Sequence, residues 1–378
     1  MDTHLLPPHF WPLLVLCLLA YLSLWWVILG SGRAARRRTL RMRIAALGQE
    51  DAAFTPSEAA NMQESLSRKV LPPPGEPSAG PLRNPLYAIP WFLFVGDTSA
   101  GVPELLDAAA GTRVPPPAGP AGRAFWQWRR LPSMVAIDIH PSVLNEMQEP
   151  RERSLWYMAL LELAERRERL PLNGIVVCMS VSALLGDPQA RDAVSLRLRT
   201  LVHDVAEHLR IQLPVYLVVT GLERLDGYEV VRTSLPAEVL AQALGHRLAN
   251  DAAPRSPADV QLDGLFSEIT QRLRALRMGL FRAQRNPAGR QAIHAFVEQV
   301  RALQPGLRAT ADCLFGYGHG PRSPRWRGLY LTASPSGGLG GAFAKDLFSH
   351  FLPSDQPLAH SRRPGVAIDD YFSQTTRM

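Results

Sequence analysis

Two glycines in the first third of the chain stand at the spacing of a phosphate-binding loop. The segment GDTSAGVP places Gly96 and Gly101 where the pattern G-x-x-x-x-G-K-[ST] has its glycines. In a working loop, backbone N–H groups cradle the phosphates, the lysine reaches the β- and γ-phosphates, and the hydroxyl holds Mg²⁺. Here Val102 takes the lysine position and Pro103 the hydroxyl position, and Asp97 adds a negative charge inside the loop. We therefore expect a vestigial loop, with no bound cofactor and no catalysis.

Two further positions agree with this interpretation. Asp138 ends an apolar run, where a magnesium-associated carboxylate of the Walker B kind would stand. Thr220, Gly221 and Glu223 follow another apolar run, where guanine-reading enzymes carry an Asn or Thr, a Lys and an Asp. Gly221 and Glu223 break that pattern, so the base-reading loop is also vestigial. His140 could serve as a base, but no nucleophile pattern accompanies it, and we interpret it as an ordinary loop histidine.

Short apolar runs alternate with longer amphipathic segments around these positions. Strands are predicted at residues 88–95, 124–131, 133–138, 173–181 and 214–220, and helices at residues 103–111, 151–169 and 190–210. Most of the strand segments are apolar on both faces, which is typical of a parallel sheet that helices cover on both sides. The predicted fold class is therefore α/β, a P-loop NTPase-like, mostly parallel sheet.

The pattern changes from about residue 234. Helices are predicted at residues 258–283, 288–303 and 342–352, with one late strand at residues 327–334. These segments indicate an appended helical subdomain after the sheet.

The N-terminal region carries a long uncharged run at residues 10–29. As a helix, about 20 residues span about 30 Å, the thickness of a hydrocarbon core, so we predict one transmembrane helix. Trp11 near one end, and Trp25 and Trp26 near the other, fit interfacial belts. Arginines follow with no acidic residue among them: Arg33, Arg36, Arg37, Arg38, Arg41 and Arg43. By the positive-inside rule the N-terminus is periplasmic and the main domain cytoplasmic, and the arginines contact anionic lipid.

The amino-acid composition excludes several classes of protein and of site. The 378 residues are 46% hydrophobic and 20% charged, which excludes a mainly disordered polyelectrolyte. The three cysteines lack the spacing of a metal site or a disulfide framework, so we expect no metal. The net charge of +7 is concentrated in the basic run. Because this run directly follows the apolar segment, it favours lipid over nucleic acid as the partner.

The sequence divides into seven predicted parts. They are a periplasmic N-terminus (1–9), the transmembrane helix (10–30), a basic juxtamembrane and helical segment (31–70), a Pro/Gly linker (71–85), the degenerate P-loop NTPase-like domain (86–233), the helical subdomain with its late strand (234–352) and a polar tail (353–378).

Four segments, taken in order, resemble the cytoplasmic domain of the IcmF/TssM family. They are YAIPWFLFVG (87–96), RLPLNGIVVCMSVSALL (169–185), LRIQLPVYLVVTGLERLDGY (209–228) and WRGLYLTAS (326–334). The resemblance implies an inner-membrane component of a type VI secretion system. In that family the domain is GTPase-like with a helical appendage, and it lies at the cytoplasmic face of a complex with TssL and TssJ, near the baseplate.

This chain departs from the family pattern in two ways. Family members have two N-terminal spans, a third span after the cytoplasmic domain and a large periplasmic domain, whereas one span is expected here. Many members keep an intact phosphate-binding loop, whereas this loop has lost its Lys and Ser/Thr.

The leading hypothesis is a membrane-anchored pseudo-NTPase, a non-catalytic structural or accessory component of a type VI secretion membrane complex in the bacterial inner membrane. Its expected partners are TssL-like, TssM-like or baseplate proteins and membrane lipid, and no nucleic acid. The alternative is a membrane-tethered nucleotide hydrolase or nucleotide-binding regulator with an atypical phosphate site. A third reading is a membrane-tethered scaffold unrelated to secretion.

Overall fold

A computed structural model describes most of the chain. The described residues are 10–50, 87–109, 112–113, 126–140, 150–248, 257–316, 324–335 and 341–359, without the side chains of residues 10, 25–33, 47–50, 112–113 and 150–152. The predictions for Trp25, Trp26, Arg33 and the linker at residues 71–85 therefore lie outside the described residues and side chains. The same holds for residues 1–9 and for the last part of the predicted tail.

One mixed sheet forms the centre of the molecule. Within the described residues it has eight strands in the order β2-β3-β4-β1-β5-β6-β8-β7. The five inner strands run parallel: β4 (Val135–Ile139), β1 (Trp91–Gly96), β5 (Gly174–Ser180), β6 (Pro214–Thr220) and β8 (Arg325–Leu331). The remaining strands are antiparallel to their neighbours: β2 (Thr112–Arg113) and β7 (Leu244–Arg247) at the two edges, and β3 (Trp126–Arg130) between β2 and β4. The prediction of a mostly parallel α/β sheet is confirmed.

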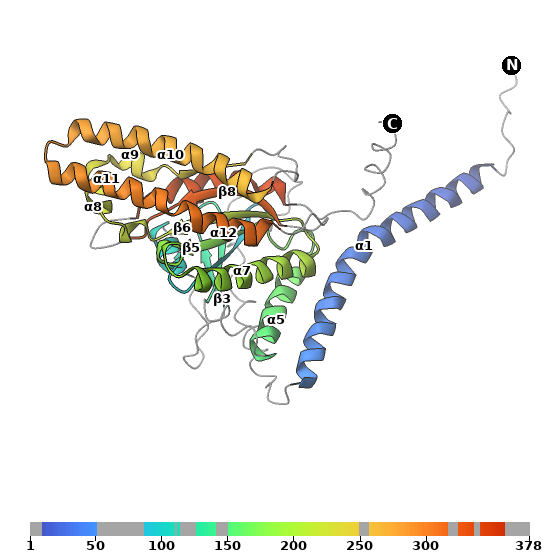
Figure 1. The fold of residues 1–378 in the computed structure, drawn as a ribbon. Coiled ribbons are helices and arrows are strands. Elements are labelled where there is room, and N and C mark those ends of the chain that lie inside the picture. The colour runs from blue at the N-terminus through green and yellow to red at the C-terminus, as the bar shows by residue number, and fades with distance from the viewer. Residues whose placement is uncertain are drawn as a thin grey trace, which may run out of the picture.

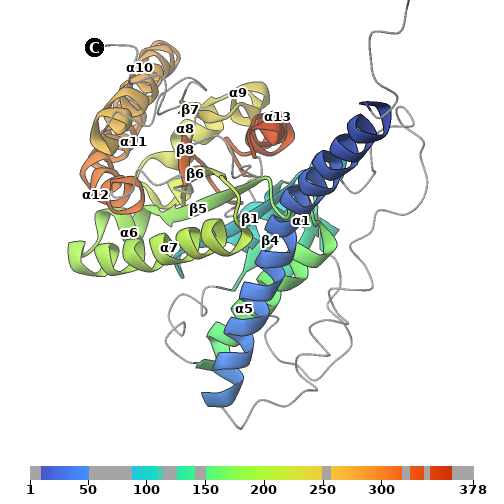
Figure 2. The ribbon, with the colours of Figure 1, turned by 90° about the vertical axis from the view of Figure 1, so that its right-hand side faces the viewer.

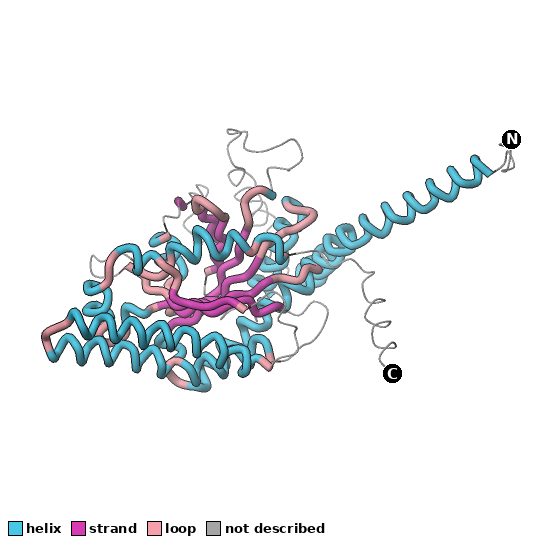
Figure 3. The backbone as a smooth tube through the Cα atoms, turned by 90° about the horizontal axis from the view of Figure 1, so that it is seen from above, coloured by secondary structure: helices cyan, strands magenta, loops and turns pink. Residues whose placement is uncertain are grey.

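The apolar runs of the inner strands are buried because helices cover both faces of the sheet. Successive side chains of a strand point to opposite faces. Leu93 and Val177 belong to one core, whereas Phe94 and Cys178 belong to the other. Figure 3 shows the strands lying between helical layers.

The larger core lies under a thick helical layer. Its helices include α5 (Pro150–Arg166), α6 (Val181–Leu185), α7 (Pro188–Leu209), α10 (Ala258–Ala283), α11 (Pro287–Ala302) and α12 (Gln304–Phe315). Helix α7 begins where the Asp187 side chain accepts the Ala190 N–H at 2.9 Å, and it ends at Arg210, which takes a left-handed conformation. Figures 1 and 2 show α7 and α12 along the sheet, and the α10–α11 hairpin extending beyond it.

The smaller core lies under α3 (Val102–Ala108) and the helical turns of residues 345–354, which include a π-helical stretch (Leu347–Phe351) and α13 (Leu352–Ser354). Shorter elements complete the fold: η2 (Leu222–Arg224), α8 (Tyr228–Ser234), α9 (Ala237–Ala241) and η4 (Gln356–Leu358). The helix predicted at residues 342–352 therefore begins later, and the first residues of the predicted polar tail are helical.

The late strand joins the main sheet, since β8 pairs with β6 on one side and β7 on the other. The residues after 234 thus complete the sheet in addition to forming helices. The division at residue 233 itself stays a prediction.

The first helix, α1 (Phe10–Glu50), is continuous across the predicted boundary at residue 30. Its C-terminal half packs on α5, and Leu40 is fully buried there (Figures 1 and 2). Its N-terminal half extends away from the domain. Among the described residues, no helix meets the length and hydropathy of a candidate membrane span.

Candidate functional site

The predicted phosphate loop lies at the carboxyl end of β1, where the order of the sheet reverses. Strand β1 lies between β4 and β5, and the chain leaves it for α3 through residues 97–101. In open α/β sheets, ligands bind outside the carboxyl ends of the strands at such a switch point. The position is therefore the one that a nucleotide-binding chain would use.

An internal carboxylate occupies this loop. The Asp97 side chain is buried, with 4% of its surface exposed. One carboxylate oxygen accepts the backbone N–H of Ser180 at 2.7 Å. The other accepts the Ser180 hydroxyl at 2.8 Å and the backbone N–H of Ser99 at 3.0 Å. Asp97 thus supplies, from within the protein, the anion that these donors hold. Hydrogen bonds to an ionised acceptor are about twice as strong as neutral ones.

The loop is also packed closely against the sheet. A Cβ atom added to Gly96 would lie 3.0 Å from the Cβ atoms of Ala100 and Cys178, so close approach favours glycine here. Gly101 has a φ of 59°, in the left-handed region where glycine is favoured. The turn itself thus favours both glycines, whether or not a phosphate binds.

The two altered positions lie at the start of α3. Val102 is buried in the smaller core with Leu105 and Leu106, so its side chain packs under the helix. Pro103 stands in the first turn, where its missing N–H removes a donor that a phosphate would use.

Asp138 lies near the loop, at the end of β4. It pairs with Phe94 in the register of the sheet and is buried. Burial, followed by the carboxylates of Asp138 and Asp97, raises the pKa of the Cys178 thiol well above its ordinary value. The carboxyl end of β1 is therefore a region of negative charge, which opposes a phosphate.

The third predicted position lies at the end of β6 and is held by contacts within the protein. Thr220 is fully buried at the end of β6, and Gly221 has a φ of 89°. The Glu223 carboxylate accepts the backbone N–H of Ser334 at 3.0 Å, which holds the loop to the segment after β8. A base-reading carboxylate would need to face a ligand, whereas this one is engaged within the protein.

A chain of hydrogen bonds connects the loops after β6 and β1. The Arg224 guanidinium donates to the Ser182 hydroxyl at 3.1 Å, and Ser182 donates to the Ser180 hydroxyl at 3.1 Å. Ser180 in turn donates to Asp97. Ser180 and Ser182 were not predicted as site residues. The signal that could have found Ser180 is its position as N-cap of α6, where it accepts the Ala183 N–H at 3.0 Å.

Several of the arginines predicted to contact lipid also contact α5 and the residues that follow it. Arg36 is buried, and it donates to the backbone carbonyl of Glu168 at 3.3 Å. Arg37 forms an ion pair with the Glu168 carboxylate. Arg41 pairs with Glu165 at 2.7 Å. Arg38 is exposed, as is Trp11 at the start of α1. His140 is half-buried directly after β4.

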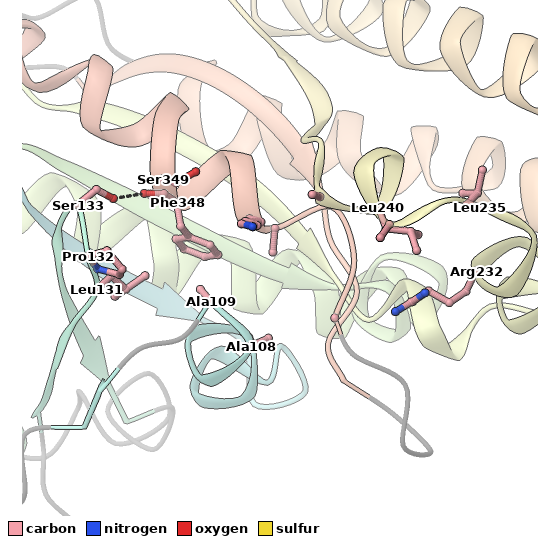
Figure 4. A pocket seen from close by; sticks show the side chains of 15 residues that line it. Ala108, Ala109, Leu131, Pro132, Ser133, Arg232, Leu235, Leu240, Phe348 and Ser349 are labelled. Carbon is pink, nitrogen blue, oxygen red and sulfur yellow. Dashed lines mark hydrogen bonds between the residues drawn. The ribbon is translucent and has the colours of Figure 1, made fainter.

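A separate cavity of about 690 Å³ lies over the smaller core. It is bounded by the end of α3, the turn before β4, α9 and the helical turns near Phe348 (Figure 4). The Ser133 hydroxyl donates to the Phe348 carbonyl across one side of it at 2.8 Å. Among the described residues that line this cavity there is no site residue predicted from the sequence, so the cavity is distinct from the predicted phosphate loop.

The comparison with protein families agrees with the geometry. Residues 149–339 match the family described as the IcmF-related N-terminal domain. The chain belongs to the IcmF/TssM family. The match begins with the residues of α5 and extends past β8, so it covers strands β5, β6, β7 and β8 and the α10–α11 hairpin.

A characterised relative gives the same assignment. The chain is similar to "Type VI secretion system component TssM1" of Pseudomonas aeruginosa strain PAO1, with 25% identity. The alignment covers 71% of this chain and 26% of the relative. The chain therefore spans about a quarter of the length of that relative.

Proposed function

We propose that this IcmF/TssM family member is a non-catalytic structural or accessory subunit of a type VI secretion membrane complex. In this proposal a helix anchors it in the bacterial inner membrane, and its domain contacts protein partners at the cytoplasmic face. Family membership and the similarity to TssM1 support the connection with type VI secretion. The observation that carries the non-catalytic part is the Asp97 carboxylate inside the loop.

Nucleotide binding would require this carboxylate to leave. A phosphate would have to replace three hydrogen bonds that Asp97 already accepts from Ser99 and Ser180. It would also lack the lysine and hydroxyl contacts that Val102 and Pro103 cannot provide. A hydrogen bond to a charged group contributes about 1.5–3 kcal/mol. Losing two such contacts lowers affinity by roughly two to four decades.

The proposed anchor is supported by the surface of α1. Large apolar side chains are exposed along its N-terminal half: Trp11, Leu13, Leu14, Val15, Leu16, Leu18, Leu19, Tyr21, Leu22 and Leu24. A contiguous apolar surface of this kind needs a covering partner, and a lipid bilayer covers a helix on all sides. The arginines after it favour a cytoplasmic C-terminal side. Arg36 and Arg37 then hold the domain to the anchor at the membrane surface.

The test is complementation of a strain that lacks this gene, with export of a type VI substrate as the readout. A double substitution, Thr98→Ala with Ser99→Ala, removes both hydroxyls of the loop. It leaves intact the backbone N–H through which Ser99 binds Asp97. A subunit that does not use nucleotide predicts full complementation by this variant and none by a chain without residues 10–30. The proposal fails if the double variant loses export at normal protein levels, or if deleting the gene leaves export unchanged.

A further inference from the structure

The α10–α11 hairpin carries a concentrated positive charge. Between Glu268 and Glu298 the chain has no Asp or Glu, and it carries six arginines: Arg272, Arg274, Arg277, Arg282, Arg285 and Arg290. Both helices bury one apolar face, with Leu273 and Leu280 on α10 and Ile293 and Phe296 on α11. The arginines are therefore presented by a packed and rigid element.

Three of these arginines have their charge engaged within the protein. Arg272 donates to the carbonyl of Gly245 at 3.0 Å, and Arg290 donates to the carbonyl of Gln284 at 2.7 Å. Arg277 pairs with Glu298 at 3.1 Å. Their positions are explained by the packing of the hairpin itself.

The other three have no such explanation. Arg274, Arg282 and Arg285 are exposed, and within the part of the chain that the structure describes they make no hydrogen bond or ion pair. On a helix, residues four apart lie on one face. Arg274, Met278 and Arg282 are spaced in this way on α10, and Arg285 follows in the turn. Met278 is 54% exposed, so an apolar side chain stands in the middle of this basic stripe.

The location of the stripe argues against a lipid partner. The hairpin turn and the N-terminus of α1 lie at opposite ends of the molecule in two perpendicular views (Figures 1 and 3). If the N-terminal half of α1 lies in the membrane, the hairpin points away from it. This step rests on the function proposed above.

We propose that Arg274, Met278, Arg282 and Arg285, the hairpin stripe, bind an acidic surface of a protein partner. Exposed guanidinium groups favour carboxylates, with which they form paired hydrogen bonds. Methionine at the centre of the stripe offers an adaptable apolar contact of the kind found at protein-binding surfaces. Single-stranded nucleic acid would instead call for exposed aromatic side chains on which bases stack.

The test uses the full chain in micelles of an uncharged detergent and fluorescently labelled poly-L-glutamate as the acidic polypeptide. The variant R274Q/R282Q/R285Q removes the three charges of the stripe. The matched control R130Q/R169Q/R197Q removes three exposed arginines elsewhere on the domain. We expect about a tenfold rise in Kd for the stripe variant and less than about a twofold rise for the control. R274K/R282K/R285K keeps the charges but loses the paired hydrogen bonds of the guanidinium, so its Kd should lie between those of the wild type and R274Q/R282Q/R285Q.

Equal weakening in the stripe variant and the control would overturn the proposal, as would absence of polyglutamate binding by the wild-type chain. Vesicles containing phosphatidylglycerol and a short DNA duplex provide the other arms. If the stripe variant loses affinity for either of these while keeping its affinity for polyglutamate, the surface serves lipid or nucleic acid instead. None of these binding measurements involves nucleotide. Failure of the proposal for the hairpin stripe can therefore be distinguished from failure of the non-catalytic proposal.

Discussion

Replacing Asp97 with asparagine tests whether the carboxylate holds the loop together. The substitution keeps the shape of the side chain and removes its charge. Of the three hydrogen bonds that Asp97 accepts, all lose their charge assistance, and one amide nitrogen faces a donor from Ser180 or Ser99. A charge-assisted hydrogen bond contributes about 1 kcal/mol more than a neutral one, and a mismatched buried donor adds a similar penalty. We therefore expect a loss of about 2–4 kcal/mol of stability.

The assay is thermal unfolding of the full chain in detergent, followed by circular dichroism. At about 2.1 cal/mol/K per residue, the unfolding entropy of a chain of 378 residues is about 0.8 kcal/mol/K, so 1 kcal/mol shifts Tm by about 1.3 °C. Asp97→Asn should therefore lower Tm by about 3–5 °C. The matched control is Asp187→Asn. Asp187 is exposed and accepts one N–H at the start of α7, where asparagine caps equally well, so Tm should move by less than about 1 °C. If the two substitutions have the same small effect, the carboxylate does not hold the loop and the reasoning is refuted.

Two further predictions concern the anchor contact and a buried tyrosine. Leu40 is fully buried where α1 packs on α5, so Leu40→Ala should weaken the packing of α1 on α5 by about 2–5 kcal/mol. Tryptic cleavage at Arg37 and Arg41 should then become faster. The exposed Leu19→Ala serves as its control, and equal cleavage rates would contradict the packing. Burial, followed by Asp355, raises the pKa of Tyr216, whose hydroxyl donates to that carboxylate at 2.8 Å. The folded state therefore favours the neutral phenol, and the stability that this provides below about pH 10 is lost as pH rises further. Tyr216→Phe should show a smaller fall of Tm than the wild type between about pH 9 and pH 11, and parallel curves would contradict it.

The strands of the parallel core were predictable because they are buried on both faces. The run at residues 214–220 is apolar throughout apart from its last residue, and β6 has those same bounds. Strand β7 was missed because its four residues, Leu244–Arg247, include a glycine and lie at an edge. Helix α12 was missed because Pro305 and Gly306 resemble a break, whereas the proline stands in the first turn, which tolerates it.

The altered residues of the predicted phosphate loop could be read from the sequence, but the contacts of Asp97 could not. Sequence alone indicates a negative charge in the loop. That the charge is held by Ser180 depends on the register of β1 and β5, in which Gly96 lies opposite Cys178. The contacts of Arg36 and Arg41 with Glu168 and Glu165 likewise depend on how α1 packs on α5, because the partners are far apart in the sequence.

The most direct test of the central claim is calorimetric titration of GTP and ATP into the full chain in detergent, with and without Mg²⁺. An internal carboxylate in the loop, together with valine and proline at the lysine and hydroxyl positions, predicts no measurable heat of binding up to millimolar nucleotide. Val102→Lys combined with Pro103→Thr should not restore hydrolysis, because Asp97 stays in the loop and Gly221 and Glu223 replace the base-reading residues. Micromolar binding by the unmodified chain would contradict the non-catalytic proposal and favour a nucleotide-dependent regulator.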